Sequence, residues 1–266
     1  MKKTAGFYLY LSLDIENSTL YKTYDRDWAE LFTNIYKDVF HIATNTWKDC
    51  KLWKSLGDEL LFYKKVDSKK DLLQSFASIN QICVKSNTYI KKMSPNNIKV
   101  KLAFKTTLFS GVAVNDLGKD KNKWSYLTLI TPNLADEDRL DFLGPDIDTG
   151  FRIAKFSLRN IIVLDAKLSY ILSLINPKFI TNAKIIQFEI LKGIWKNHHY
   201  PIIWYVNDWK KLASSFSYED KFKNKALKYL EINNDTKFSK ISELKRIFNE
   251  LGKNEEINAI KRILKI

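Results

Sequence analysis

The order of hydrophobic periods near the start of the chain constrains its fold more than any other sequence feature. Residues 7–13 form a β-rich run, and residues 28–47 then repeat their apolar side chains every three or four positions, as an amphipathic helix does. Two short apolar segments follow, one on each side of the pair Gly57-Asp58. Such a pair between apolar segments predicts a β-hairpin with Asp58 at its tip.

The next segments add a second helix and a further strand to this order. A second helix is expected over residues 69–93, since Pro95 cannot continue it, and a strand is expected over residues 100–108. The order β-α-β-β-α-β predicts an α+β fold, a ferredoxin-like antiparallel sheet with helices packed on it. Later additions are expected as a helix at 147–158, a β-segment at 161–164 and a β-hairpin at 185–206.

The composition changes near residue 207, toward Lys, Glu and Asn. Two amphipathic helical stretches follow, with Gly252 between them. The sequence therefore predicts one main domain at 1–206 and a separately packed helical extension at 207–266. The chain has 45% hydrophobic and 14% aromatic residues in a length of 266, which is enough for one substantial core.

Several classes of protein are disfavoured by what the sequence lacks. It has no run of about 18 apolar residues, and it begins without a signal-peptide pattern, so no stable membrane insertion is expected. Cys50 and Cys83 are the two cysteines and there are three histidines, too few for a disulfide framework or a zinc site. We therefore expect a cytoplasmic protein.

The formal charge of +14 would suit a polyanionic partner. Nucleic acid, an anionic membrane surface and a triphosphate in a basic cleft all satisfy this description, and charge alone does not choose among them. The lysines are scattered along the whole chain, which also fits an ordinary solvated surface. The aromatic spacing does not indicate a stacking platform, so no nucleic-acid partner is expected.

Two carboxylates carry the chemistry that the sequence predicts. Asp14 ends the first β-run and Asp58 lies at the hairpin tip, so the two can meet at neighbouring strand edges. Mg²⁺ and Mn²⁺ prefer oxygen ligands and complete their shells with substrate phosphates. Ser18 and Thr19 begin a helical region, where hydroxyls and backbone N–H groups suit phosphate oxygens. Taken alone, each aspartate also fits an ordinary turn.

At these positions the sequence resembles the class III adenylate and guanylate cyclase family, from about residue 7 to 206. The resemblance implies a catalytic domain that closes a nucleoside triphosphate into a 3′,5′-cyclic monophosphate. The motifs that carry it are, in order, Asp14-Ile15 with Ser18-Thr19, then Gly57-Asp58-Glu59, then the block from Asp141 to Arg152, and last Leu191-Lys192-Gly193.

The resemblance implies a role for each matched residue. Asp14 and Asp58 would hold two divalent metal ions, Mn²⁺ or Mg²⁺, with help from the backbone carbonyl of Ile15. Arg152 would stabilise charge on the reacting phosphate, and Lys192 would hold the triphosphate. A solvent-facing helix arginine and a hairpin lysine are the simpler alternatives for these last two.

The chain departs from the family at one position. Asp148 stands where the family has an asparagine that orients the ribose, four residues before Arg152. An ionised aspartate accepts a hydrogen bond from a ribose hydroxyl but cannot donate one. Asp148 is therefore a ribose contact, a helix cap or an ionic partner of Arg152.

The family shares each active site between two subunits, so the resemblance also implies a homodimer with two composite sites and an inactive monomer. The base-contacting positions that it implies are Lys54 and Asp141. A lysine donor beside a carboxylate acceptor suits the edge of cytosine or adenine, whereas uracil and guanine present the reverse pattern.

The residues around Arg152 resemble the pyrimidine cyclases of Pycsar anti-phage systems more than adenylate cyclases. Leu52 and Trp53 could narrow the base pocket, or could be core residues. We therefore expect CTP as substrate slightly ahead of UTP, then ATP, with a non-catalytic nucleotide-binding module as the remaining alternative. The resemblance further implies that the cyclic product signals to a separate effector protein.

Overall fold

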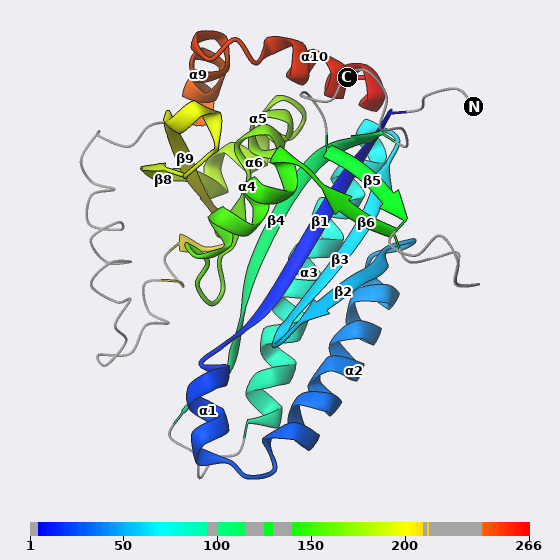
Figure 1. The fold of residues 1–266 in the computed structure, drawn as a ribbon, viewed down its shortest axis with the longest axis vertical. Helices are drawn as coiled ribbons and strands as arrows, with labels where there is room; N and C mark the ends of the chain where they lie inside the picture. The colour runs from blue at the N-terminus through cyan, green and yellow to red at the C-terminus, as the bar shows by residue number, and fades with distance from the viewer. Residues whose placement is uncertain (1–4, 95–99, 115–124, 130–139, 210–211, 213–240) are drawn as a thin grey trace.

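The computed structural model describes residues 5–94, 100–114, 125–129, 140–209, 212 and 241–266. A β-sheet runs through the centre of this part of the molecule (Figure 1). Its strands are β1 (Ala5–Glu16), β2 (Lys51–Leu56), β3 (Glu59–Val66), β4 (Ala103–Val114), β5 (Ser125–Leu129), β6 (Leu140–Leu143), β7 (Ile162–Leu164), β8 (Ala183–Ile190) and β9 (His199–Tyr205). The described helices are α1 (Ser18–Tyr24), α2 (Trp28–Thr46), α3 (Lys69–Met93), α4 (Pro145–Ala154), α5 (Ala166–Ile175), α6 (Pro177–Asn182), the 3₁₀ turns η1 (Trp195–Asn197) and η3 (Ile241–Glu243), α9 (Leu244–Glu250) and α10 (Asn254–Leu264).

The strand order confirms the predicted α+β fold and its antiparallel centre. The order is β2-β3-β1-β4-β7-β9-β8, and β1 is antiparallel to both of its neighbours. Strand β4 also pairs in parallel with β7, and its last two residues pair in parallel with β5. Strands β5 and β6 therefore form a short branch at one end of the sheet.

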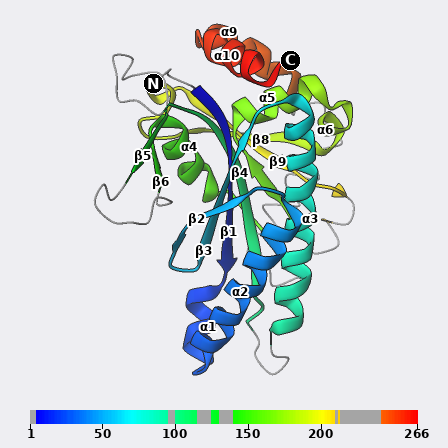
Figure 2. The same cartoon turned by 90° about the vertical axis from the view of Figure 1, so that its right-hand side faces the viewer.

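Each face of the sheet has its own helices (Figure 2). Helices α2 and α3 cover one face, where Phe62 of β3 stacks on Phe40 of α2 at 6.5 Å between ring centroids. The opposite face carries α4 together with β5 and β6. Tyr10 of β1 stacks there on Phe109 of β4 at 5.1 Å, and Gly150 of α4 lies directly over the Phe109 ring.

Most predicted elements are present, but several have different ends. The hairpin around Gly57 and the helix over residues 69–93 are confirmed. The strand expected at 100–108 begins instead at Ala103 and reaches Val114, because it pairs with β1 along the whole length of that strand. The helix expected at 147–158 begins earlier, because Pro145 suits a first helical position, and it ends at Ala154.

The C-terminal helices are present, but they are not packed separately as expected. Phe248 of α9 contacts Tyr170 of α5 and Trp195, at 5.5 and 5.8 Å between ring centroids. The domain boundary at 206/207 stays a prediction, and residues 213–240 of the extension lie outside the described part. No helix in the described ranges is both long enough and apolar enough to cross a membrane. Cys50 and Cys83 are buried free thiols.

Candidate active site

The two carboxylates predicted to bind metal lie together where β1 ends and the β2–β3 turn begins. Asp14 pairs with Glu59 in the β1–β3 register, and the Ile15 N–H donates to the carbonyl of Asp58 at 3.3 Å. Burial raises the pKa of Asp14, the Lys105 ammonium opposes the rise, and the charge of Asp58 adds to it. The two carboxylates are therefore close enough to repel each other.

Neighbouring side chains hold this acidic pair in place. Asn17 has a φ of 64°, a left-handed conformation that asparagine tolerates, and it turns the chain from β1 into α1. This turn directs the Ser18 hydroxyl to Asp58, to which it donates a hydrogen bond. Ser18 is therefore buried and already engaged, whereas Thr19 is exposed. Lys105 of β4 forms an ion pair with Asp14.

The acidic pair fits a hard divalent cation. Mg²⁺ usually takes one or two carboxylates from the protein and completes its shell with water and substrate phosphate. Asp14 and Asp58 supply two carboxylates, while Lys105 is the single lysine paired with them in the described part of the chain. Within the described ranges, no three His, Cys, Asp or Glu side chains gather as a complete metal site. Water and substrate oxygens would provide the remaining ligands.

The two residues predicted to read the base contact each other. Lys54 Nζ lies 2.9 Å from Asp141 Oδ1, and the indole N–H of Trp53 donates to the same oxygen at 2.9 Å. The backbone N–H of Phe142 is a third donor, also at 2.9 Å. In the described part of the chain, the other carboxylate oxygen of Asp141 accepts no hydrogen bond. It can accept one from a bound molecule.

The Trp53 ring belongs to an aromatic cluster between the sheet and α4. Its centroid lies 5.7 Å from that of Tyr10, 5.3 Å from that of Phe142 and 6.3 Å from that of Phe151. The cluster supports the interpretation of Trp53 as a core residue that also orients Asp141. Leu52 is 41% exposed and does not join this cluster.

Helix α4 carries Asp148 and Arg152 on its exposed surface. The helix begins after Gly144, whose φ of 133° is one that glycine readily adopts, so Gly144 and not Asp148 occupies the cap position. No ion pair joins Asp148 to Arg152 in the described structure, which also removes the second alternative for Asp148. The ribose contact stays a prediction.

Lys192 lies in the connection between β8 and β9, as predicted for a hairpin residue, and its side chain is exposed. This connection has an unusual backbone. Gly193 has a φ of 78°, and Trp195, Lys196 and Asn197 have φ values of 50°, 53° and 64°. Consecutive left-handed residues other than glycine are strained, and such strain is concentrated at functional sites in proteins.

Asp14 and the Lys54–Asp141 pair lie on one side of the sheet, but the predicted residues do not form one contact network. Alternate side chains of a strand point to the same face, so Tyr10 and Asp14 of β1 lie on the face that carries α4. The Lys54–Asp141 pair lies on that face too, because Trp53 contacts Tyr10. Arg152 and Lys192 make no hydrogen bond or ion pair with either group in the described structure.

Three contributors to the site were not predicted from the sequence. Lys105 pairs with Asp14, the Tyr36 hydroxyl donates to the Gly57 carbonyl at 2.9 Å, and Trp53 donates to Asp141. Lys105 left a weak signal in the sequence, as the single charged residue of β4. The partners of all three are distant in sequence, and the tertiary packing of strands and helices brings them together.

Comparison with known proteins supports the fold. No family model matches the sequence, and no curated protein matches it. Among solved structures, the adenylyl cyclase CyaB from P. aeruginosa is 13% identical with a TM-score of 0.52, over 83% of this chain and 99% of that chain.

Two guanylyl cyclase domains resemble this chain with similar TM-scores. The domain of RhGC from Catenaria anguillulae, solved in complex with GTP, is 15% identical with a TM-score of 0.53, over 77% of this chain and 98% of that chain. A dimeric domain of the RhoGC fusion protein from Blastocladiella emersonii is 13% identical with a TM-score of 0.51, over the same shares. The chain therefore has the fold of class III adenylyl and guanylyl cyclase catalytic domains.

Proposed function

We propose that this protein is a class III nucleotidyl cyclase that converts a pyrimidine nucleoside triphosphate, CTP ahead of UTP, into its 3′,5′-cyclic monophosphate and diphosphate. The observation that carries the proposal is the Asp14–Asp58 pair at the end of β1, in a chain with the cyclase fold. Two carboxylates facing each other at a strand end, with one paired lysine, form a site that favours added positive charge.

In the proposed reaction the ribose 3′-hydroxyl gives its proton to water, and its oxygen attacks the α-phosphorus. A new bond forms between that oxygen and phosphorus, and the bond from phosphorus to the β-bridging oxygen breaks, which releases diphosphate. Divalent ions bound by Asp14 and Asp58 would lower the pKa of the 3′-hydroxyl and offset charge on the phosphates. Arg152 would stabilise charge on the reacting phosphate, and Lys192 would hold the triphosphate.

The Lys54–Asp141 pair supports the choice of base. The free oxygen of Asp141 can accept a hydrogen bond from an exocyclic amine, and Lys54 can donate to the neighbouring ring nitrogen. Cytosine and adenine both present this edge. The resemblance to pyrimidine cyclases places CTP first, UTP second by the same mechanism, and ATP third.

We propose a homodimer in which each active site takes Asp14 and Asp58 from one subunit and the base and phosphate contacts from the other. One of the similar structures is a cyclase domain described as a non-canonical dimer, which supports dimer formation by this fold, whereas the sharing of the site rests on the family resemblance. Leu143 and Phe151, on the face that carries α4, are 55% and 37% exposed and could pack against a second copy.

The proposed biological role follows the resemblance to Pycsar systems. The cyclic pyrimidine nucleotide would act in the cytoplasm as a second messenger in antiviral defence, and a separate effector protein would respond to it.

The test of this function is incubation of the purified protein with each of the four nucleoside triphosphates and Mn²⁺, followed by mass spectrometry of the products. Cyclic CMP as the main product is the expected result. Cyclic UMP alone would reverse the order of the two pyrimidines, and cyclic AMP alone would contradict pyrimidine specificity. Nucleotide binding without any cyclic product would support the non-catalytic alternative.

A further inference from the structure

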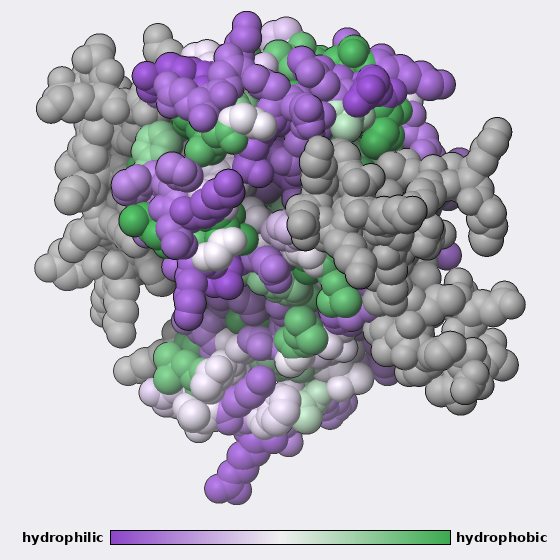
Figure 3. Space-filling model, turned by 45° about the horizontal axis from the view of Figure 1, so that its top comes forward, coloured by the Kyte–Doolittle hydropathy of each residue, from purple (hydrophilic) through white to green (hydrophobic). Residues whose placement is uncertain are grey.

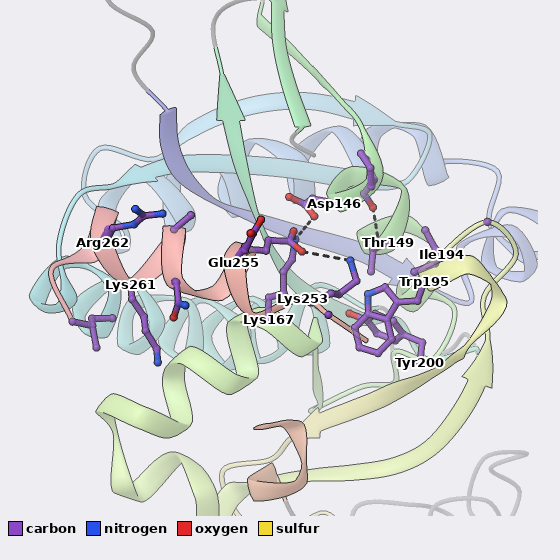
Figure 4. Close-up of a pocket in the computed structure, with 17 residues that line it drawn as sticks. Asp146, Thr149, Lys167, Ile194, Trp195, Tyr200, Lys253, Glu255, Lys261 and Arg262 are labelled. Carbon is purple, nitrogen blue, oxygen red and sulfur yellow. Dashed lines mark hydrogen bonds and ion pairs between the residues drawn. The ribbon is translucent and has the colours of Figure 1, made fainter. Parts of the chain in front are cut away.

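A cleft of about 810 Å³ separates the C-terminal helix from the part of the fold that carries Arg152 and Lys192 (Figure 4). One side is α10, and the other is formed by the first turn of α4 and the β8–β9 connection. Trp195 and Tyr200, from that connection and β9, lie against each other at 4.5 Å between ring centroids. This hollow lies between α10 and these two elements, and charged residues of α4, α5 and α10 line it.

A buried group of charged side chains connects α10, α5 and α4. Lys167 of α5 forms an ion pair with Asp146 in the first turn of α4, and a second with Glu256 of α10 at 2.7 Å. Lys253 lies 3.5 Å from Glu256. Figure 4 shows Asp146, Lys167 and Lys253 converging at the centre of the cleft. The two positive and two negative charges balance one another. They therefore connect the helices and do not form a site for a charged ligand.

Charge on Lys167 is strongly favoured at this position. Burial by itself lowers the pKa of Lys167, but Asp146 and Glu256 more than reverse this, and the pKa is raised. The side chains of Lys167 and Asp146 are 10% and 8% exposed. A buried ion pair is costly to leave incomplete, so loss of one partner forces the others to move or to admit water.

Asp146, in the first turn of α4, contacts both Lys167 and β4. One of its carboxylate oxygens accepts from the Val112 N–H of β4 at 3.3 Å, while the other pairs with Lys167. Gly111 provides the space for this contact, since a Cβ there would lie 3.0 Å from Asp146. Asp146 is two residues before Asp148 and six before Arg152, on the same short helix.

The outer surface of the C-terminal helices is mainly hydrophilic (Figure 3). The apolar residues Ile257, Ile260 and Leu264 of α10 are buried against the rest of the chain. Helix α10 thus packs on the rest of the chain through its apolar side, and Glu256 forms its ion pair with Lys167.

We propose that the C-terminal helix α10 controls the position of α4, with Glu256 and Lys167 as positioning residues that act through Asp146 on Arg152. This inference rests on the proposed cyclase function for its effect on catalysis, but the coupling between α10 and α4 does not depend on it. Any partner that displaces α10 would uncouple Arg152 in the same way, which gives the extension a regulatory role.

The test uses the full chain with Glu256→Gln, which keeps the shape of the side chain and removes its charge. The matched control is Glu250→Gln on α9, where the side chain is 64% exposed and lies 3.8 Å from Arg246. Hydrogen exchange is measured by mass spectrometry in peptides that cover α4 and α3. We expect exchange in α4 to rise about tenfold in Glu256→Gln, with α3 unchanged, and no change in the control.

Kinetics with the best nucleotide substrate provide the second measurement. Since Arg152 would act on the transition state, kcat should fall about tenfold in Glu256→Gln while KM changes less than about twofold. Glu256→Asp, which keeps the charge, should recover part of the loss. Unchanged exchange in α4, equal increases in α3 and α4, or unchanged kcat would each overturn the proposal. If the wild-type protein has no cyclase activity, the proposed function fails, while exchange still decides whether α10 is coupled to α4.

Discussion

Two groups of charged side chains, one where β1 ends and one beside the first turn of α4, differ in how completely their charges are neutralised. At the end of β1, Asp14 and Asp58 share one paired lysine, Lys105, and the side chains of Asp14 and Lys105 are 32% and 29% exposed. Beside α4, Lys167 and Asp146 are almost fully buried, and Glu256 completes a matched network.

The degree of neutralisation distinguishes a binding site from a structural ion-pair network. Partly buried carboxylates that repel each other gain most from an added cation, because their charges are only partly balanced. Buried charges with complete partners gain nothing from a ligand and lose stability when any partner is removed. Substitution in the first group should therefore act directly on catalysis, whereas substitution in the second should lower stability and affect catalysis only through the position of α4.

The largest effect is expected at the acidic pair. Asp58→Asn should lower cyclase activity by about a thousandfold, because it removes a ligand for the ions that act on the reacting phosphate. Product formation and size-exclusion chromatography would show lost activity with unchanged assembly. Asp67→Asn, at an exposed carboxylate that pairs with Lys65 on the surface, is the control. Retained turnover in Asp58→Asn would remove the metal role.

The second prediction compares the two lysines directly. Lys167→Met should lower the free energy of unfolding by about 3–5 kcal/mol, because it leaves buried carboxylates without their partner. Lys105→Met, at a half-exposed pair, should lower it by less than about 1 kcal/mol. Urea unfolding followed by tryptophan fluorescence measures both. Equal losses would contradict the distinction between the two groups.

The third prediction concerns pH and the buried network. Burial raises the pKa of Asp165 to about 6, although Lys167 opposes the rise, whereas an unfolded aspartate has a pKa of about 3.9. The folded state therefore holds the proton more tightly, and stability from this group is fully present below about pH 4. It falls by about 3 kcal/mol as the pH rises through 6.

Urea unfolding at a series of pH values checks this dependence. Asp165→Asn, which cannot titrate but retains an oxygen for the N-cap bond to Leu168, should show a flatter profile between about pH 4 and 6. The same slope in wild type and variant would assign the dependence to other groups.

The smallest effect is expected from metal binding without substrate. Mn²⁺ at about ten times its dissociation constant should stabilise the wild-type protein by about 1.4 kcal/mol, a rise in Tm of a few degrees. Differential scanning fluorimetry measures the shift. Asp14→Asn should show no shift, and an equal shift in that variant would place the bound ion elsewhere.

Local patterns predicted the elements that position the acidic pair. The β-run that ends at Asp14, the Gly57-Asp58 turn and the helix over residues 69–93 all depend on neighbouring residues, so the sequence indicates them directly. Lys54 and Asp141, the two positions that the family resemblance indicated, contact each other, and their role in binding the base stays a prediction. Lys105 and Tyr36 were missed, because strand register and helix packing, not sequence spacing, bring them to the site.

What the sequence determined by itself is the order of the core elements β1, α2, β2, β3, α3 and β4, and the choice of acidic and basic side chains that the proposed chemistry needs. It did not predict α5, which carries Lys167, nor α6, β5 and β6. The tertiary structure alone decided that the C-terminal helix joins the main core and that Lys167 connects it to α4 through Asp146 and Glu256. The physical reason is distance along the chain. Periodicity reports on neighbours within a few residues, whereas Lys167 and Glu256 are 89 residues apart and meet only after the core has formed.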